Sequence, residues 1–417
     1  MATNTKVFSL EGKGLKLDTA ADLEPHVKVL RELEGVEEVR FLGNTLGVEA
    51  CKALGEILET KKTLRVVNFA DIFTGRLLNE IPQALSSLLT SLLTLPNLHT
   101  VNLNDNAFGL NTQAPLVDFI SSHVPLQHLI LNNNGLGPHA GILIADALST
   151  LYEKKQAARK EGKVVPDLET VICGRNRLEN GSMTAWAKAY SLHTGLKEVK
   201  MVQNGIRQEG ISHLLSEGLK HAKGIEVLDL QDNTFTLLGA KALAKVAPGW
   251  KHIKELGIGD SLLSAKGGRL LAEALAKGEN SKLEILRLQY NDIDAKGLKD
   301  LAQAAKDALP ALKKIELNGN KFSEEDQSIM LLRELLEERK DKNAVDIVLE
   351  DEWGLDSLSD LEDESEEEES EEEEEEAEEL REKLISEAEE AQEEPISLQT
   401  DKEVDELAKE LEKKVEI

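Results

Sequence analysis

Three short stretches of this sequence carry polar residues that could bind a charged group on another molecule. Thr74-Gly75-Arg76 puts one arginine on a glycine-containing loop, and Gly174-Arg175-Asn176-Arg177 puts two more cations on a second loop. Arginine can bind a phosphate or a carboxylate through two parallel hydrogen bonds, so both loops are candidate anion-binding sites. Between these loops in the sequence, Asn132 and Asn133 add two adjacent side-chain amides. These residues indicate recognition of a partner.

Each of these residues also has a simpler explanation. Arg76 could be an ordinary surface arginine that pairs with Glu80 or Asp105. The two asparagines could be no more than surface polarity, and the two arginines of the second loop could be solvated. The residue types alone leave both interpretations open.

The sequence contains no motif for an active site of its own. It has no G-x-x-x-x-G-K-[ST] phosphate loop, no nucleophile elbow and no metal-ligand cluster. His99, His123 and His128 are close in sequence, but their spacing is not that of metal ligands. Paired carboxylates lie mostly near the C-terminus, where a solvated run of charge is the ordinary explanation. We therefore expect a protein that is not an enzyme, with no cofactor and no metal.

The segment Leu126–Gly137 shows what must position these residues. Its residues follow the leucine-rich repeat pattern L-x-x-L-x-L-x-x-N-x-L, with Leu129 and Leu131 two apart and Asn134 in the asparagine place. Leucines two apart on a strand point to the same side, which predicts a short strand facing a core. The asparagine amide can bind backbone groups where the strand ends, and such amides would stack from repeat to repeat. One repeat cannot bury its own apolar face, so neighbouring copies are required.

Ten copies of the pattern follow one another, and eight of them have the asparagine; Ile72 and Ser261 replace it in the other two. The copies begin at Val36, Leu64, Leu98, Leu126, Leu168, Leu196, Ile225, Ile253, Leu283 and Leu312. Val7–Leu17 forms a degenerate copy that would cap the N-terminal end. The regular spacing is 28 to 30 residues, which leaves room for a helix in each repeat, as in ribonuclease-inhibitor-type repeats. We expect an α/β solenoid of about eleven repeats, a crescent with an inner parallel sheet and outer helices.

Two repeats are longer than the rest, and the boundaries of the domain follow from a change in composition. The extra residues lie near 71–76 and 154–163, and insertions in solenoids map to loops. Residues 350–379 contain 20 acidic residues and no lysine or arginine, so most of the net charge of −29 belongs to the C-terminal part. We expect a repeat domain over 1–349, closed by Val345–Leu349, an acidic disordered tail over 350–379 and a charged, transiently helical segment over 380–417.

Charge and cysteine content limit the class of partner and the compartment. The near-neutral body and acidic tail argue against nucleic-acid binding, which needs a basic face. No apolar run reaches the roughly 18 residues that span a bilayer, and the N-terminus lacks a secretory segment. Cys51 and Cys173 are expected to be buried thiols in a reducing compartment. These features favour a cytosolic or nucleocytoplasmic soluble protein. We also expect a monomer that binds neither membranes nor nucleic acid.

Several blocks of the sequence resemble the Ran GTPase-activating protein family, in its fungal form. They include Asp71–Arg76, Leu103–Gly109, Ile172–Ser182, Val199–Arg207, Leu228–Thr236 and Glu316–Ser323. The resemblance covers about residues 1–345 and extends to the acidic tail. It implies a GTPase-activating protein that stimulates hydrolysis of Ran-GTP in the cytoplasm, with the nucleus or nuclear envelope as further locations, in support of nucleocytoplasmic transport. It also implies Ran-binding protein as a co-activator, while GTP and magnesium belong to Ran.

The resemblance implies roles for particular residues. In this family the activator orders the catalytic glutamine of the GTPase instead of inserting an arginine finger. Asn133 matches the family asparagine that contacts the GTPase near the nucleotide, and Arg76 matches an arginine expected to anchor or orient Ran. Arg175 and Arg177 match basic residues near the interface. Asn132 and Asp105 complete the expected set of partner-binding residues.

Two other functions remain open. A leucine-rich repeat inhibitor or scaffold would occupy a partner without accelerating a reaction, although ribonuclease inhibitors are normally rich in cysteine. A histone chaperone would use the acidic tail over residues 350–379 to bind basic proteins.

Overall fold

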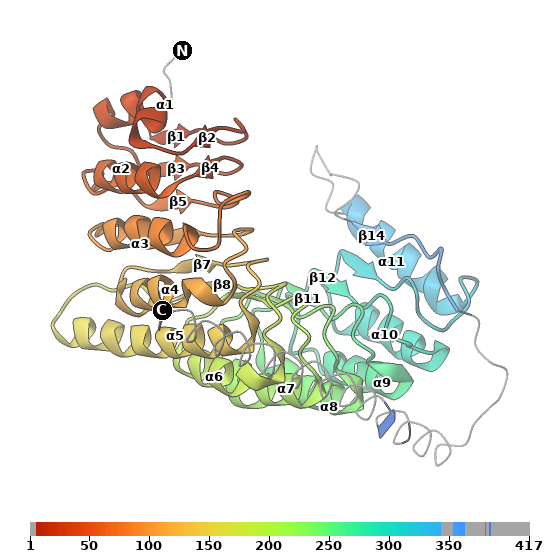
Figure 1. Ribbon diagram of the computed structural model, residues 1–417. Coiled ribbons are helices and arrows are strands. Elements are labelled where there is room, and N and C mark those ends of the chain that lie inside the picture. The colour runs from red at the N-terminus through yellow and green to blue at the C-terminus, as the bar shows by residue number, and fades with distance from the viewer. Residues whose placement is uncertain (1–5, 343–352, 363–379, 381–382, 385–417) are drawn as a thin grey trace, which may run out of the picture. The chain divides into compact units, whose positions relative to one another are not determined.

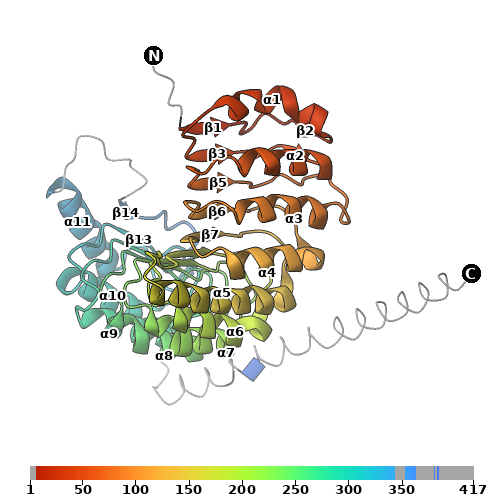
Figure 2. The ribbon, with the colours of Figure 1, turned by 90° about the vertical axis from the view of Figure 1, so that its left-hand side faces the viewer.

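The computed structural model describes residues 6–342, 353–362, 380 and 383–384 of the 417-residue chain. The chain divides into two compact units, residues 1–364 and residues 365–417. The first unit contains the repeats. Within it, strands follow one another along one side and helices cover the other side (Figures 1 and 2).

The described strands form one long parallel sheet and one small one. Each strand of the long sheet pairs with the strands of the neighbouring repeats, so that Leu129 stands between Val101 and Val171. The long sheet contains β1 (Val7–Ser9), β3 (Glu38–Arg40), β5 (Val66–Asn68), β6 (Thr100–Asn102), β7 (His128–Ile130), β8 (Thr170–Ile172), β9 (Glu198–Lys200), β10 (Val227–Asp229), β11 (Glu255–Gly257), β12 (Ile285–Arg287), β13 (Lys314–Glu316) and β14 (Gly354–Leu355). The small sheet pairs β2 (Lys16–Leu17) with β4 (Thr45–Leu46).

Eleven α-helices are found in the described residues, each following the strand of its repeat. They are α1 (Ala20–Glu32), α2 (Val48–Leu58), α3 (Ile81–Leu92), α4 (Gln113–Ser122), α5 (Gly137–Lys160), α6 (Glu179–Leu192), α7 (Gln208–His213), α8 (Thr236–Val246), α9 (Ser264–Ala276), α10 (Ala295–Asp307) and α11 (Gln327–Lys342). The expectation of a loop near residues 154–163 is wrong for most of that stretch, because the extra residues lengthen α5 by continuing its helical periodicity. The predicted leucine-rich repeat solenoid is confirmed.

The repeat leucines form a continuous core between the strands and the helices. Leu126, Leu129, Leu131 and Leu136 are all fully buried, as are their counterparts in the neighbouring repeats. Cys51 and Cys173 are buried free thiols, as predicted, and burial raises the pKa of Cys173 to about 12. Each inward-facing side chain packs on the repeats before and after it, so the core extends along the stack.

The repeat asparagines form a buried hydrogen-bonded ladder, which confirms the role predicted for them. The Asn134 side-chain oxygen accepts a hydrogen bond from the backbone N–H of Asn106 at 2.9 Å, and its amide nitrogen donates to the carbonyls of Leu103 and Leu131. Asn176 repeats this arrangement by accepting from the Asn134 N–H. The ladder therefore satisfies backbone groups at the turn that leads from each strand to its helix.

The C-terminal end of the repeat unit extends beyond the expected boundary at residue 349. After residues 343–352, the chain adds β14 beside β13. The two carboxylate oxygens of Asp356 accept hydrogen bonds from the backbone N–H groups of Leu317 and Asn318. Leu358 is buried against the core. The expectation that an acidic disordered tail begins at residue 350 is wrong for residues 353–362, because they cover the open edge of the last strand. Val345–Leu349, expected to close the core, and residues 363–379 lie outside the described residues.

Candidate functional site at the strand-to-helix turns

The strand-to-helix turns place one residue of each repeat at the same exposed edge. This residue comes directly before the ladder position and has a positive φ, as in Asp105 (59°), Asn133 (54°) and Arg175 (54°). Asp232 (55°) and Asp260 (50°) occupy the same place further along the stack. The backbone N–H of this residue donates a hydrogen bond to a carbonyl of the next repeat, as Asn133 does to Gly174 at 2.9 Å, and this bond fixes the backbone conformation. Side chains at this position are therefore held in a row by the backbone.

Three of the predicted site residues are linked through this edge. The Asn133 side-chain amide donates to the Asp105 carboxylate at 2.9 Å, and both residues are exposed. The Asn132 side-chain oxygen accepts from the backbone N–H of Gly174, while its own N–H donates to the Asn104 side chain at 2.7 Å. Asn132 thus holds neighbouring turns together. Asn133 and Asp105 present polar atoms that remain accessible on a backbone that cannot easily move.

Arg175 and Arg177 line an open cleft together with Asn133. The cleft has a volume of about 670 Å³. Its other lining residues are Glu179 of the same turn and, from the next three turns, Gln203, Asn204, Gly205, Asp232, Asn233, Thr234, Asp260 and Leu262. Both arginine side chains are exposed, and neither makes an ion pair within the part of the chain that the structure describes. Burial raises the pKa of Asp232, and the neighbouring Asp260 adds to this effect. The charge of Arg175 opposes this rise in the pKa of Asp232, so the cleft combines cations and carboxylates that act on one another.

Sequence reasoning missed two carboxylates of this cleft, Asp232 and Asp260. Asp232 and Asp260 were not among the predicted site residues, although each directly precedes a ladder position, as Asn133 does. That shared place in the repeat is the signal that could have identified them.

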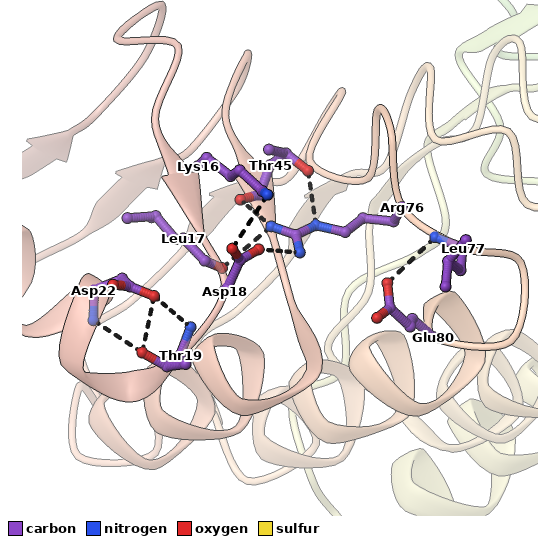
Figure 3. A network of polar contacts seen from close by, with 9 residues as sticks. All are labelled: Lys16, Leu17, Asp18, Thr19, Asp22, Thr45, Arg76, Leu77 and Glu80. Carbon is purple, nitrogen blue, oxygen red and sulfur yellow. Dashed lines mark hydrogen bonds and ion pairs between the residues drawn. The ribbon is translucent and has the colours of Figure 1, made fainter.

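Arg76 is largely buried and is bonded to the two preceding repeats. Its guanidinium binds the Asp18 carboxylate at 2.5 Å, the Thr45 hydroxyl at 2.8 Å and the Thr45 carbonyl at 2.9 Å (Figure 3). The Leu17 carbonyl is a further acceptor at 3.4 Å, and only 8% of the Arg76 side chain is exposed. The hydrogen bond from Arg76 holds the pKa of Asp18 below its ordinary value.

This arrangement corrects the ion pair expected for Arg76. The hydrogen bonds of the guanidinium in the described part of the chain go to residues of the first two repeats. Its ion-pair partner is Asp18 rather than Glu80 or Asp105. Glu80 instead accepts from the backbone N–H of Leu77 at 3.2 Å. Arg76 therefore fixes its own loop to the preceding repeats.

The described residues include neither a candidate metal site nor a candidate membrane span. They contain no group of three or more histidine, cysteine, aspartate or glutamate residues placed to hold a metal ion. None of their helices has both the length and the apolar character that crossing a bilayer requires.

The stacked strand-turn-helix units and their asparagine ladder define a leucine-rich repeat protein, and the Leucine Rich repeat family model matches residues 225–244 and 279–302. The chain is 42% identical over 336 residues to Ran GTPase-activating protein 1 of Saccharomyces cerevisiae (strain ATCC 204508 / S288c), a match that covers 79% of this chain and 81% of the relative. It is 34% identical over 321 residues to Ran GTPase-activating protein of Drosophila melanogaster, covering 76% of this chain and 53% of that one. Ran GTPase-activating protein 1 of Xenopus laevis is 43% identical over 202 residues, or 48% of this chain and 34% of the relative. The chain belongs to the Ran GTPase-activating protein family.

Proposed function

We propose that this protein accelerates the hydrolysis of GTP bound to Ran and leaves the chemical step to Ran itself. Family membership, with most of both chains aligned to the yeast relative, is the observation that carries this proposal. The exposed row of side chains at the strand-to-helix turns provides a rigid surface for a protein partner. Leucine-rich repeat proteins commonly bind partners through such loops and through the strand side of the stack.

The positions of Asn133 and Arg76 support a mechanism without an arginine finger from Arg76. GTP hydrolysis requires a positioned water and stabilisation of charge on the γ-phosphate. Arg76 forms an ion pair with Asp18, so bringing the Arg76 guanidinium to a nucleotide would break the bonds that fix its loop. Asn133 is exposed and held in place by Asp105. In the proposed mechanism the Asn133 amide contacts Ran near its nucleotide and helps to order Ran's own catalytic glutamine.

The cleft residues contribute to binding in this proposal. Arg175 and Arg177 offer exposed guanidinium groups for carboxylates on Ran, and Asp232 and Asp260 offer carboxylates for basic side chains. Complementary charges of this kind set orientation and association rate more than the final affinity. We also expect a monomer that acts in the cytoplasm in support of nucleocytoplasmic transport, with Ran-binding protein as a co-activator.

The test is γ-phosphate release from Ran-GTP in the presence of catalytic amounts of the full-length protein. Acceleration with many turnovers per molecule of protein supports the proposal. Stoichiometric binding of Ran-GTP with an unchanged hydrolysis rate would instead identify an inhibitor or scaffold. The variant Arg175→Ala/Arg177→Ala should lower the association rate and retain the rate reached at saturating protein.

A further inference from the structure

Two adjacent leucines on the loop before α3 are exposed to solvent. Leu77 and Leu78 each have 65% of their surface accessible, whereas the repeat leucines on either side of the loop are fully buried. A single exposed leucine is ordinary in a folded protein, but an adjacent pair on an inserted loop forms a small apolar surface. The repeat fold does not need these side chains, since they contribute nothing to its core.

The loop that carries the pair is ordered by contacts at both ends. Arg76 ties it to the first two repeats through Asp18, Thr45 and Leu17, and Figure 3 shows these contacts converging on the guanidinium. At the next residue, the Leu77 N–H donates to Glu80, which closes the turn into α3. The exposed leucines are therefore held outward on a fixed backbone.

The same loop is continuous with the edge that carries Asn133. The Asp71 N–H donates to the Asn104 carbonyl at 2.9 Å, and the Ile72 N–H donates to the side chain of Asn106 at 2.9 Å. Phe73, buried at the start of the loop, packs against Phe108 of the next repeat with ring centroids 6.4 Å apart. A partner bound at Asp105 and Asn133 would meet this loop on the adjacent turn.

We propose that Leu77 and Leu78 form an apolar contact surface for the GTPase, and that Arg76 is a positioning residue that holds this surface through Asp18. The inference rests on the proposed function, because continuity with the Asn133 edge identifies the partner. The apolar pair would bury surface against the GTPase on binding, and the polar edge beside it would fix the orientation. Arg76 would affect binding without touching the partner.

The first experiment compares two double variants in single-turnover hydrolysis of Ran-GTP by the full-length protein. Leu77→Gln/Leu78→Gln removes the proposed surface. Val29→Gln/Met330→Gln is the matched control, because Val29 on α1 and Met330 on α11 are 59% and 56% exposed and lie on helices outside the proposed edge. We expect the first variant to raise the protein concentration giving half-maximal rate by about tenfold, which corresponds to about 1.4 kcal/mol of lost binding. Its rate at saturation and its thermal midpoint should stay close to those of the parent.

Equal behaviour of the two double variants would overturn the proposed surface. If the parent protein does not accelerate hydrolysis, the proposed function fails, and calorimetric titration of the same variants with GTP-loaded Ran still tests the surface. Weaker binding only by Leu77→Gln/Leu78→Gln would then support the contact, and unchanged binding would exclude it.

The second experiment tests how Arg76 acts, with a double-mutant cycle on Asp18. Arg76→Ala and Asp18→Ala should each raise the half-maximal concentration, and the combined variant should be no worse than Arg76→Ala alone, since both changes release the same loop. If Arg76 touched the GTPase directly, Asp18→Ala would free the guanidinium and preserve or strengthen binding. That result, or additive effects of the two changes, would overturn the positioning role. Thermal midpoints identify any variant whose loss of activity reflects unfolding.

Discussion

Asn133 and Asn134 are adjacent in the sequence, and the structure predicts opposite consequences for removing their side chains. Asn134 is fully buried in the ladder, whereas Asn133 is exposed at the edge. We compare Asn134→Ala with Asn133→Gly. Glycine is the appropriate choice at residue 133 because the backbone there has a φ of 54°, which glycine adopts without strain.

The expected loss of stability for Asn134→Ala follows from the three hydrogen bonds that disappear. The Asn106 N–H loses the side-chain acceptor of Asn134 inside the protein, which costs about 1–3 kcal/mol. The carbonyls of Leu103 and Leu131 each retain another side-chain donor, Asn106 and Asn176 respectively, so each of these lost bonds costs about 1 kcal/mol. The sum is about 3–5 kcal/mol. Asn133→Gly loses one exposed bond to Asp105, so its stability should change by less than about 1 kcal/mol.

Urea denaturation followed by far-UV circular dichroism measures the two stabilities, and γ-phosphate release from Ran-GTP measures activity. Asn134→Ala should shift the unfolding midpoint strongly, and at temperatures where it stays folded it should retain activity. Asn133→Gly should keep the midpoint of the parent and lose most of its activity. A large stability loss in Asn133→Gly, or none in Asn134→Ala, would refute the division between ladder and edge. Full activity of a stable Asn133→Gly would remove Asn133 from the proposed site.

Three further predictions concern the core, pH and the C-terminal part. Leu131→Ala should lower the free energy of unfolding by roughly 2–5 kcal/mol through a cavity in the core, measured by urea denaturation. Burial lowers the pKa of His123 and of His193 to about 4. Between this value and the ordinary histidine pKa of 6.5, each imidazole is protonated in the unfolded chain but not in the folded protein. The free energy of unfolding should have its full value above pH 6.5 and fall as the pH drops toward 4, by up to about 3 kcal/mol per histidine. His123→Gln should weaken this pH dependence, measured by urea titrations at about pH 7 and about pH 5. Deleting residues 365–417 should lower the rate of association with Ran-GTP at low salt and leave the thermal midpoint unchanged. Deleting residues 350–417 should also lower the thermal midpoint, because it removes the strand that covers β13. An equal midpoint for both deletions would contradict the capping role.

Arg76 and Asn133 illustrate how far the candidate site could be predicted from the sequence. Asn133 was selected as an amide beside the ladder, and the structure places it at an exposed turn, bonded to Asp105. Arg76 was also expected to be available to a partner, but its side chain is committed to Asp18, 58 residues earlier. A glycine beside an arginine indicates a turn without specifying which acceptors the turn will approach. That depends on how the first three repeats stack.

The repeat length, the strand positions, the buried leucines and the ladder asparagines could all be predicted from the sequence. These follow from local periodicity, because residues two apart on a strand share a face and each repeat needs neighbours to bury that face. Three features depend on the folded chain: Arg76 binds Asp18, Leu77 and Leu78 are held outward, and residues 353–362 return to cover the last strand. Each of these outcomes joins residues that are distant in the chain, and their distances are set by the stacking of whole repeats.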